Sequence, residues 1–226
     1  MEHVDQVQSS TSHPLTFDSN GWTVFALICV TLLTMVHIQQ KMILTDQVYF
    51  NTWSQQLAYD RVEALLEMKN KWLWIGYIIT PLIVLLQVFF VASCLTTGAL
   101  IGNIKGSFRF FFGIVLRCYP VLMLQGIAIL ITALLFKEID TVADFHQADY
   151  FSAAALLSNH DLTAWYIYPL KVLSIVEVLF WLLLSWNLSQ HIGRSWMANF
   201  KFVAGSYGVG LLLWVLLIMF LQLNLS

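Results

Sequence analysis

Two ionisable side chains lie deep inside long apolar segments, and they are the first candidates for chemistry. Arg117 lies about nine residues into the run 108–136, and Glu177 lies about a dozen residues into the run 165–187. An ionised side chain at membrane depth is costly and commonly marks a path for an ion or a substrate. If the two side chains meet, each neutralises the other, and the pair would mark a proton or substrate path. The alternatives are a structural clamp, or an Arg117 that extends along its aliphatic stem to the nearer interface.

A second group of residues has the chemistry of metal ligands. His146, Asp149 and His160 lie in the acidic stretch 137–164. Their spacing contains no His-Glu-x-x-His and no cysteine pair, so they are weak candidates, and a solvated acidic loop without a metal is the expectation. A membrane-embedded hydrolase that uses His146 and His160 at the surface is the least supported hypothesis.

No pattern predicts a catalytic residue or a cofactor. The serines lack a Gly-x-Ser-x-Gly context, and the glycines between 98 and 106 lack the Lys-Ser/Thr that follows a phosphate-binding loop. The three cysteines all lie inside apolar runs and fit packing better than a disulfide framework or a zinc site. The sequence therefore favours a protein without enzymatic activity.

The elements that must position these residues are long apolar runs separated by polar gaps. Hydrophobic residues make up 59% of the chain and charged residues 11%. Most of the runs are long enough to cross a hydrocarbon layer of ~30 Å. The expected fold is an all-α, polytopic transmembrane bundle, with a polar N-terminal segment at 1–21 and a single membrane domain at 22–226. The expected spans are 22–38, 72–101, 108–136, 165–187 and 202–223.

The segments between the apolar runs predict a surface helix and the orientation of the chain in the membrane. Apolar residues recur at helical spacing among mixed charges at about 45–70, which predicts an amphipathic connector helix at the membrane surface or docked on the bundle. The short turns carry Lys105, Arg109, Arg194 and Lys201 without acidic residues, which favours cytoplasmic turns and a cytoplasmic N-terminus. The first run has no Lys or Arg before it and is not expected to be a cleavable signal peptide.

The last run contains four small residues at close spacing. Ala204, Gly205, Gly208 and Gly210 predict a seam where helix backbones approach closely, inside the monomer or between copies.

One stretch resembles a known family. The segment GALIGNIKGSFRFFFGIVLRCYPVLMLQGIAILI (98–131) places a Gly-rich turn before Ser107 and Phe108, and an aromatic-Pro pair at Tyr119 and Pro120. This order is similar to the YIP family, the Ypt/Rab-interacting five-span membrane proteins, and looks most like its bacterial members. The resemblance implies five spans with a cytoplasmic N-terminus and assigns no catalytic residue. Eukaryotic members act in vesicle traffic through small GTPases, but this chain lacks their long cytosolic N-terminal region.

Two functions remain open from the sequence. The first is an integral membrane scaffold or interaction protein without catalytic activity, which organises a membrane complex or lipids, in a bacterial inner membrane. Its partners would be membrane lipids and a protein partner or further copies of itself, and the net charge of −2 gives no reason to expect nucleic acid. The alternative is a small transporter or permease accessory subunit that uses the Arg117 and Glu177 pair, although no internal repeat supports it.

Overall fold

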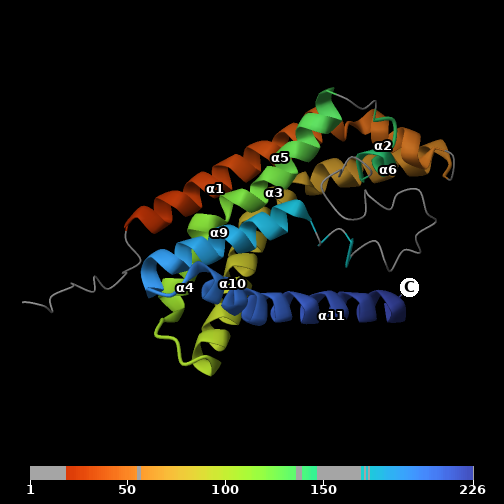
Figure 1. Ribbon diagram of the computed structural model, residues 1–226. Helices are drawn as coiled ribbons and strands as arrows, with labels where there is room; N and C mark the ends of the chain where they lie inside the picture. Colours follow the sequence, from red (N-terminus) through yellow and green to blue (C-terminus); the bar gives the residue numbers. More distant parts are fainter. Residues whose placement is uncertain are drawn as a thin grey trace, which may run out of the picture.

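The computed structural model describes residues 19–54, 57–135, 139–146, 169–170, 172 and 174–225. The elements of these residues are all helical (Figure 1). They are α1 (Ser19–Ile38), η1 (Gln39–Ile43), α2 (Asp46–Trp53), α3 (Tyr59–Ile101), α4 (Phe108–Cys118), α5 (Pro120–Leu135), α6 (Val142–His146), α9 (Ile175–Ile192), α10 (Trp196–Val203), η2 (Ala204–Gly208) and α11 (Val209–Leu225). The segments η1 and η2 are π-helical.

Five helical stretches in the described residues are long and apolar enough to cross a membrane. They are Gly21–Ile43, Tyr59–Ile101, Phe108–Leu135, Ile175–Ile192 and Trp196–Asn224. The prediction of an all-α membrane bundle is confirmed, and the chain is an integral membrane protein. The fourth helix begins at Ile175, ten residues after the expected start at 165, and residues 165–168 lie outside the described part.

The expected amphipathic helix at about 45–70 is divided between two elements. The helix α2 ends at Trp53, whereas α3 begins at Tyr59 and continues without interruption to Ile101. A helix of 43 residues is about 65 Å long, roughly twice the hydrocarbon thickness. Most charged residues at its N-terminal end, including Asp60 and Glu67, are exposed, and a helix of this length extends beyond a single hydrocarbon layer.

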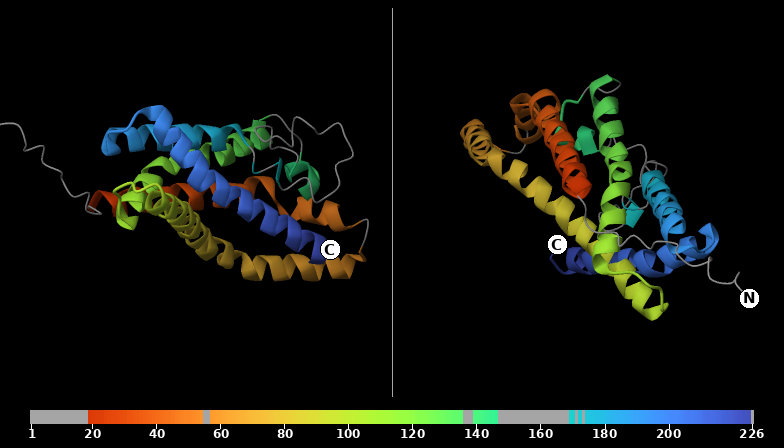
Figure 2. Two further views of the ribbon diagram at one scale, coloured as in Figure 1. Left: turned by 60° about the horizontal axis from the view of Figure 1, so that its bottom comes forward. Right: turned by 90° about the vertical axis from the view of Figure 1, so that its left-hand side faces the viewer.

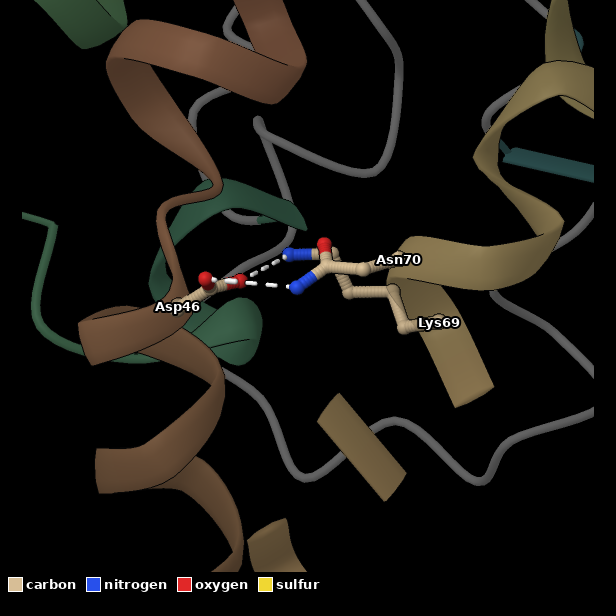
Figure 3. A network of polar contacts seen from close by, with 3 residues as sticks. All are labelled: Asp46, Lys69 and Asn70. Atoms are coloured by element: carbon tan, nitrogen blue, oxygen red, sulfur yellow. Dashed lines mark hydrogen bonds and ion pairs between the residues drawn. The ribbon is translucent and has the colours of Figure 1, made fainter. Parts of the chain in front are cut away.

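Polar contacts dock α2 on this extension of α3 (Figure 3). The Lys69 ammonium donates to Oδ1 of Asp46 at 2.8 Å, and Asn70 donates to Oδ2 of Asp46 at 3.4 Å. Lys69 also lies 4.2 Å from the centre of the Tyr49 ring. The two turns of α2 are therefore held by one carboxylate and one aromatic ring.

The docking of α2 should depend on pH only in the acidic range. The hydrogen bond from Lys69 holds the pKa of Asp46 below its ordinary value of 3.8. A carboxyl with a lowered pKa stabilises the folded state above the ordinary pKa, and this stabilisation is lost as the pH falls through the lowered value. We expect amide hydrogen exchange in α2 to be slower in the wild type than in Asp46→Asn at pH 6, and the difference to decrease as the pH falls below 3.8. Because 58% of the Asp46 side chain is exposed, the effect should be small. A difference that did not decrease as the pH was lowered below 3.8 would contradict this account.

The main core lies where α3, α4, α9 and α10 meet. Phe111, Phe180 and Leu184 are fully buried there, together with Val203. The turn from α3 to α4 packs on this core, because a Cβ at Gly106 would lie 2.7 Å from the Phe111 ring. Ser107 caps α4 by accepting from the Phe110 amide at 3.4 Å.

The small residues of the last span face the interior of the monomer at two positions. A Cβ at Gly208 would lie 2.7 Å from the Trp181 ring of α9, and a Cβ at Gly210 would collide with Sγ of Cys94 in α3. Gly205 has nothing within 4 Å, and Ala204 is half-buried. The structure thus places Gly208 and Gly210 in a seam against α9 and α3, and leaves Gly205 open.

The helix ends fall into two groups (Figures 1 and 2). The α3–α4 turn and the α9–α10 turn lie at one end of the bundle, while α2, α6 and the C-terminal end of α11 lie at the other. The first turns of α11 pack on α3 through Gly210 and Trp214, but only 11% of the last span, Trp196–Asn224, is buried. The apolar surfaces of α1 and α11 are therefore largely available to lipid or to another protein.

Candidate functional site: an intramembrane cleft

A cleft of about 490 Å³ opens between α3, the α4–α5 segment, α9 and the last span. Its lining is mostly apolar, with leucine or valine side chains from α3, the α4–α5 segment and the last span, and with Val172 from the residues before α9. Its polar lining residues are Gln87, Tyr119, Gln125, Ser174, Glu177 and Tyr207. A cavity of this size with a few polar groups on apolar walls has the usual properties of a small-molecule site.

Glu177 is placed by the start of α9. Ser174 is the N-cap residue, and its Oγ accepts from the Glu177 amide at 3.1 Å. The pattern Ser-x-x-Glu is a capping box, in which the glutamate side chain ordinarily returns to the N-cap amide. Here the Glu177 carboxylate accepts instead from Trp181 Nε1 at 2.9 Å and from the Tyr207 hydroxyl at 2.8 Å. The carboxylate is thus held across the gap between α9 and the last span.

Tyr207 reaches Glu177 from the π-helical segment η2. It is buried, with 4% of its surface exposed. Its ring lies edge-on to Phe180 at 6.0 Å and to Trp181 at 5.9 Å. Short π-helical segments inside α-helices are frequent at functional sites, because the extra residue redirects the side chains around it. In this chain the segment carries the hydroxyl that binds the intramembrane carboxylate.

Within the described part of the chain, Glu177 has no protein counter-ion in the cleft. Among the described lining residues there is no Lys, Arg or His. Both hydrogen bonds go to Oε1, and no described residue donates to Oε2. In its ionised form the Glu177 carboxylate is stabilised by two neutral donors and by the N-terminus of α9, which carries partial positive charge. The site therefore offers a free acceptor oxygen to a positively charged or protonated group.

The structure does not join the predicted pair. Arg117 lies in the last turn of α4 and is exposed on the outside of the bundle. Within the described part of the chain, no ion pair connects it to Glu177. The two residues are on neighbouring helices, but their side chains point to different surroundings.

Further polar and aromatic contacts complete the walls. The Tyr119 hydroxyl donates to Oε1 of Gln87 at 2.5 Å. Phe90 and Trp214 approach with ring centres 5.8 Å apart and connect α3 to α11. Aromatic rings from α3 and α11 thus line the same cleft as the carboxylate.

The remaining predicted candidates lie elsewhere. The His146 side chain, Asp149 and His160 are outside the described residues. A second cavity, of about 320 Å³, lies between α2 and the end of α5, with Asp140 as its acidic lining residue. Its polar groups form no cluster comparable with that around Glu177.

Two residues of the site were not anticipated from the sequence. Tyr207 and Trp181 are aromatic residues in apolar helices and do not differ in type from the aromatic residues that face lipid. The feature of the sequence that could have located them is the Ser174–Glu177 spacing, which marks the start of a helix. It places Glu177 in the first turn of α9 and Trp181 one turn further along the same face.

Comparison of the chain with protein-family models, curated proteins and solved structures finds no match. The similarity to the YIP family stays a prediction from the sequence. The function is therefore inferred from the cleft itself.

Proposed function

We propose that this membrane protein binds a small solute in the cleft around Glu177 and acts as a small transporter or as an accessory subunit of a permease. The observation that carries the proposal is an intramembrane carboxylate that lines a cleft of about 490 Å³ without a protein counter-ion among the described residues. A carboxylate needed only for packing would be satisfied by a cationic side chain or would be replaced by an apolar residue, because charge at this depth is costly.

The position of the cleft supports the proposal. Its walls come from four different membrane segments, and the last of them contacts α3 beyond η2 at few positions, among them Gly210 and Trp214. A site between helices with few mutual contacts can open to one side without unfolding. A chain of this size would form a complete path by association with a second copy or a larger subunit, for which the exposed faces of α1 and α11 are suited. We place the protein in a bacterial inner membrane, in keeping with the predicted family.

The test is charge displacement in proteoliposomes on a solid-supported membrane. A panel of amines, amino acids, organic acids, sugars and inorganic cations is perfused in turn. We expect at least one class to produce a transient current in the wild type. Glu177→Gln should reduce this current at least about tenfold, because the charge that recognises the solute is lost.

Arg117→Leu is the matched control. It also removes a charge from a membrane helix, but from an exposed position outside the cleft. The current should survive this substitution. If Arg117→Leu abolished the current together with Glu177→Gln while both variants assembled, the two charges would act as the pair predicted from the sequence. If no solute class produced a current, the transport proposal would fail.

A membrane scaffold is the second candidate. The observation that favours it is the low burial of two spans, 6% for Gly21–Ile43 and 11% for Trp196–Asn224. Exposed apolar helices are available for a protein partner, a second copy or specific lipids. Absence of any current, together with a stoichiometric protein partner after mild purification, would decide for this function.

A further inference from the structure

We propose that the solute of this cleft is a protonated amine that carries apolar substituents. This inference rests on the proposed function and names the class of solute. The ammonium N–H would donate to Oε2 of Glu177, and the substituents would lie among the aromatic and aliphatic walls.

The charge of the cleft lining determines which charge the solute must carry. Glu177 is the single carboxylate among the described lining residues, and no cationic lining residue opposes it. An anionic solute would meet uncompensated repulsion in a site where the apolar walls strengthen electrostatic interactions. A cation restores neutrality, and it does so without displacing Tyr207 or Trp181, because both already bind Oε1.

The ligand set argues against a bare inorganic cation. Calcium takes six to eight oxygen ligands, and magnesium takes an octahedral set with several waters. Among the described lining residues, the side-chain oxygens belong to one carboxylate, two glutamines and the hydroxyls of Ser174, Tyr119 and Tyr207. The three hydroxyl groups already take part in hydrogen bonds within the protein. Moreover, the Gln87 oxygen already accepts from Tyr119. An organic ammonium ion needs only one or two acceptors and tolerates apolar surroundings.

The walls fit the substituents of such an ion. Five of the described lining residues are aromatic, namely Phe90, Tyr119, Phe180, Tyr207 and Trp214. Rings attract a cation through the negative charge of their faces, and indole does so most strongly. Leu86, Leu122 and Leu211 add aliphatic surface for the alkyl groups. A neutral sugar or a short amino acid would leave most of this apolar wall without a partner.

The test uses the full chain in lipid nanodiscs and three small probes of similar shape. Tripropylammonium is the cation, 2-propylpentanamide the neutral compound and 2-propylpentanoate the anion. Binding is measured by calorimetry, with empty nanodiscs to subtract partition into lipid. We expect saturable binding of tripropylammonium alone. Glu177→Gln should weaken this binding at least about tenfold, which is the effect of losing a hydrogen bond to a charged group.

A second pair of variants tests the aromatic wall. Trp214→Leu removes a lining ring, and Trp186→Leu removes a ring of α9 that is 53% exposed and does not line the cleft. We expect Trp214→Leu to weaken tripropylammonium binding about threefold to tenfold, and Trp186→Leu to leave it unchanged.

Equal binding of the amide or the anion, or unchanged binding in Glu177→Gln, would overturn the inference. The comparison of probes on the wild type remains decisive even if a variant fails to fold. The outcome is separable from that of the proposed function. A Glu177-dependent current carried by a sugar or an organic acid would refute the amine and retain the transporter, whereas specific amine binding without any current would retain the amine site and refute transport.

Discussion

Replacing Phe111 by alanine is expected to give one of the largest losses of stability among substitutions that shorten a side chain in this protein. Phe111 is fully buried at the centre of the main core, against the Phe202 ring at 6.3 Å and beneath the glycine turn that begins α4. Removing a buried phenyl ring leaves a cavity that close-packed neighbours fill only in part, and such changes cost about 3–5 kcal/mol. Reversible unfolding in mixed micelles should report a decrease of this size in the free energy of unfolding.

The control for Phe111→Ala is Phe220→Ala. Phe220 belongs to α11 and is 63% exposed on the surface of the bundle. It has the same chemistry but leaves no cavity when it is shortened, so its loss should change the free energy of unfolding by less than about 1 kcal/mol. Equal destabilisation by the two substitutions would show that the core does not lie where α3, α4 and α10 meet.

Replacing Gly210 by leucine is expected to separate the last span from α3. The Cβ of any residue at this position would meet Sγ of Cys94, and a leucine would also reach toward Phe90. Forcing extra methylenes into a close helix contact commonly costs about 1–3 kcal/mol. Because α11 has few other contacts, we expect the helix to move away, and the thermal midpoint in detergent to fall.

Gly205→Leu is the comparison for Gly210→Leu. Gly205 lies five residues earlier on the same span and has nothing within 4 Å of its Cβ position. Its substitution should leave the thermal midpoint within error of the wild type. A loss of stability in Gly205→Leu but not in Gly210→Leu would mean that the seam faces a partner molecule instead of Cys94.

The bundle could be predicted because apolar runs in a membrane protein have no alternative to helix. A backbone in lipid must satisfy its hydrogen bonds within the segment, so length and lack of charge are sufficient to locate the spans. The extent of α3 could not be predicted in this way. Its first turns contain charges such as Asp60 and Glu67 that are typical of a connector. No proline or glycine lies between Tyr59 and Trp74 to end a helix before the apolar run, and this was the only indication of one continuous helix.

The sequence predicts a site residue only where an ionisable side chain lies in an apolar helix, because burying such a side chain is costly. That cost drew attention to Glu177, which lines the cleft, and equally to Arg117, which does not. The difference between them is rotational, since each step along a helix turns the side chain by about 100°. The prediction of an ion pair used the depth of Arg117 and Glu177 in the membrane but not the direction in which each side chain leaves its helix. Tyr207 had no charge to mark it, and its role depends on the π-helical geometry of η2, which no residue type specifies.

The π-helical segment η2 has a consequence for changes in chain length. A π turn holds one residue more than the α turn it replaces, so the residues before and after it are out of phase with a regular helix by about 100°. Deleting any one residue from 204–208 would close the bulge and rotate one flank against the other. The Tyr207 bond to Glu177 and the contact of Gly210 with Cys94 could then not coexist. The fold of the last span should therefore tolerate many substitutions better than the deletion of a single residue from this segment.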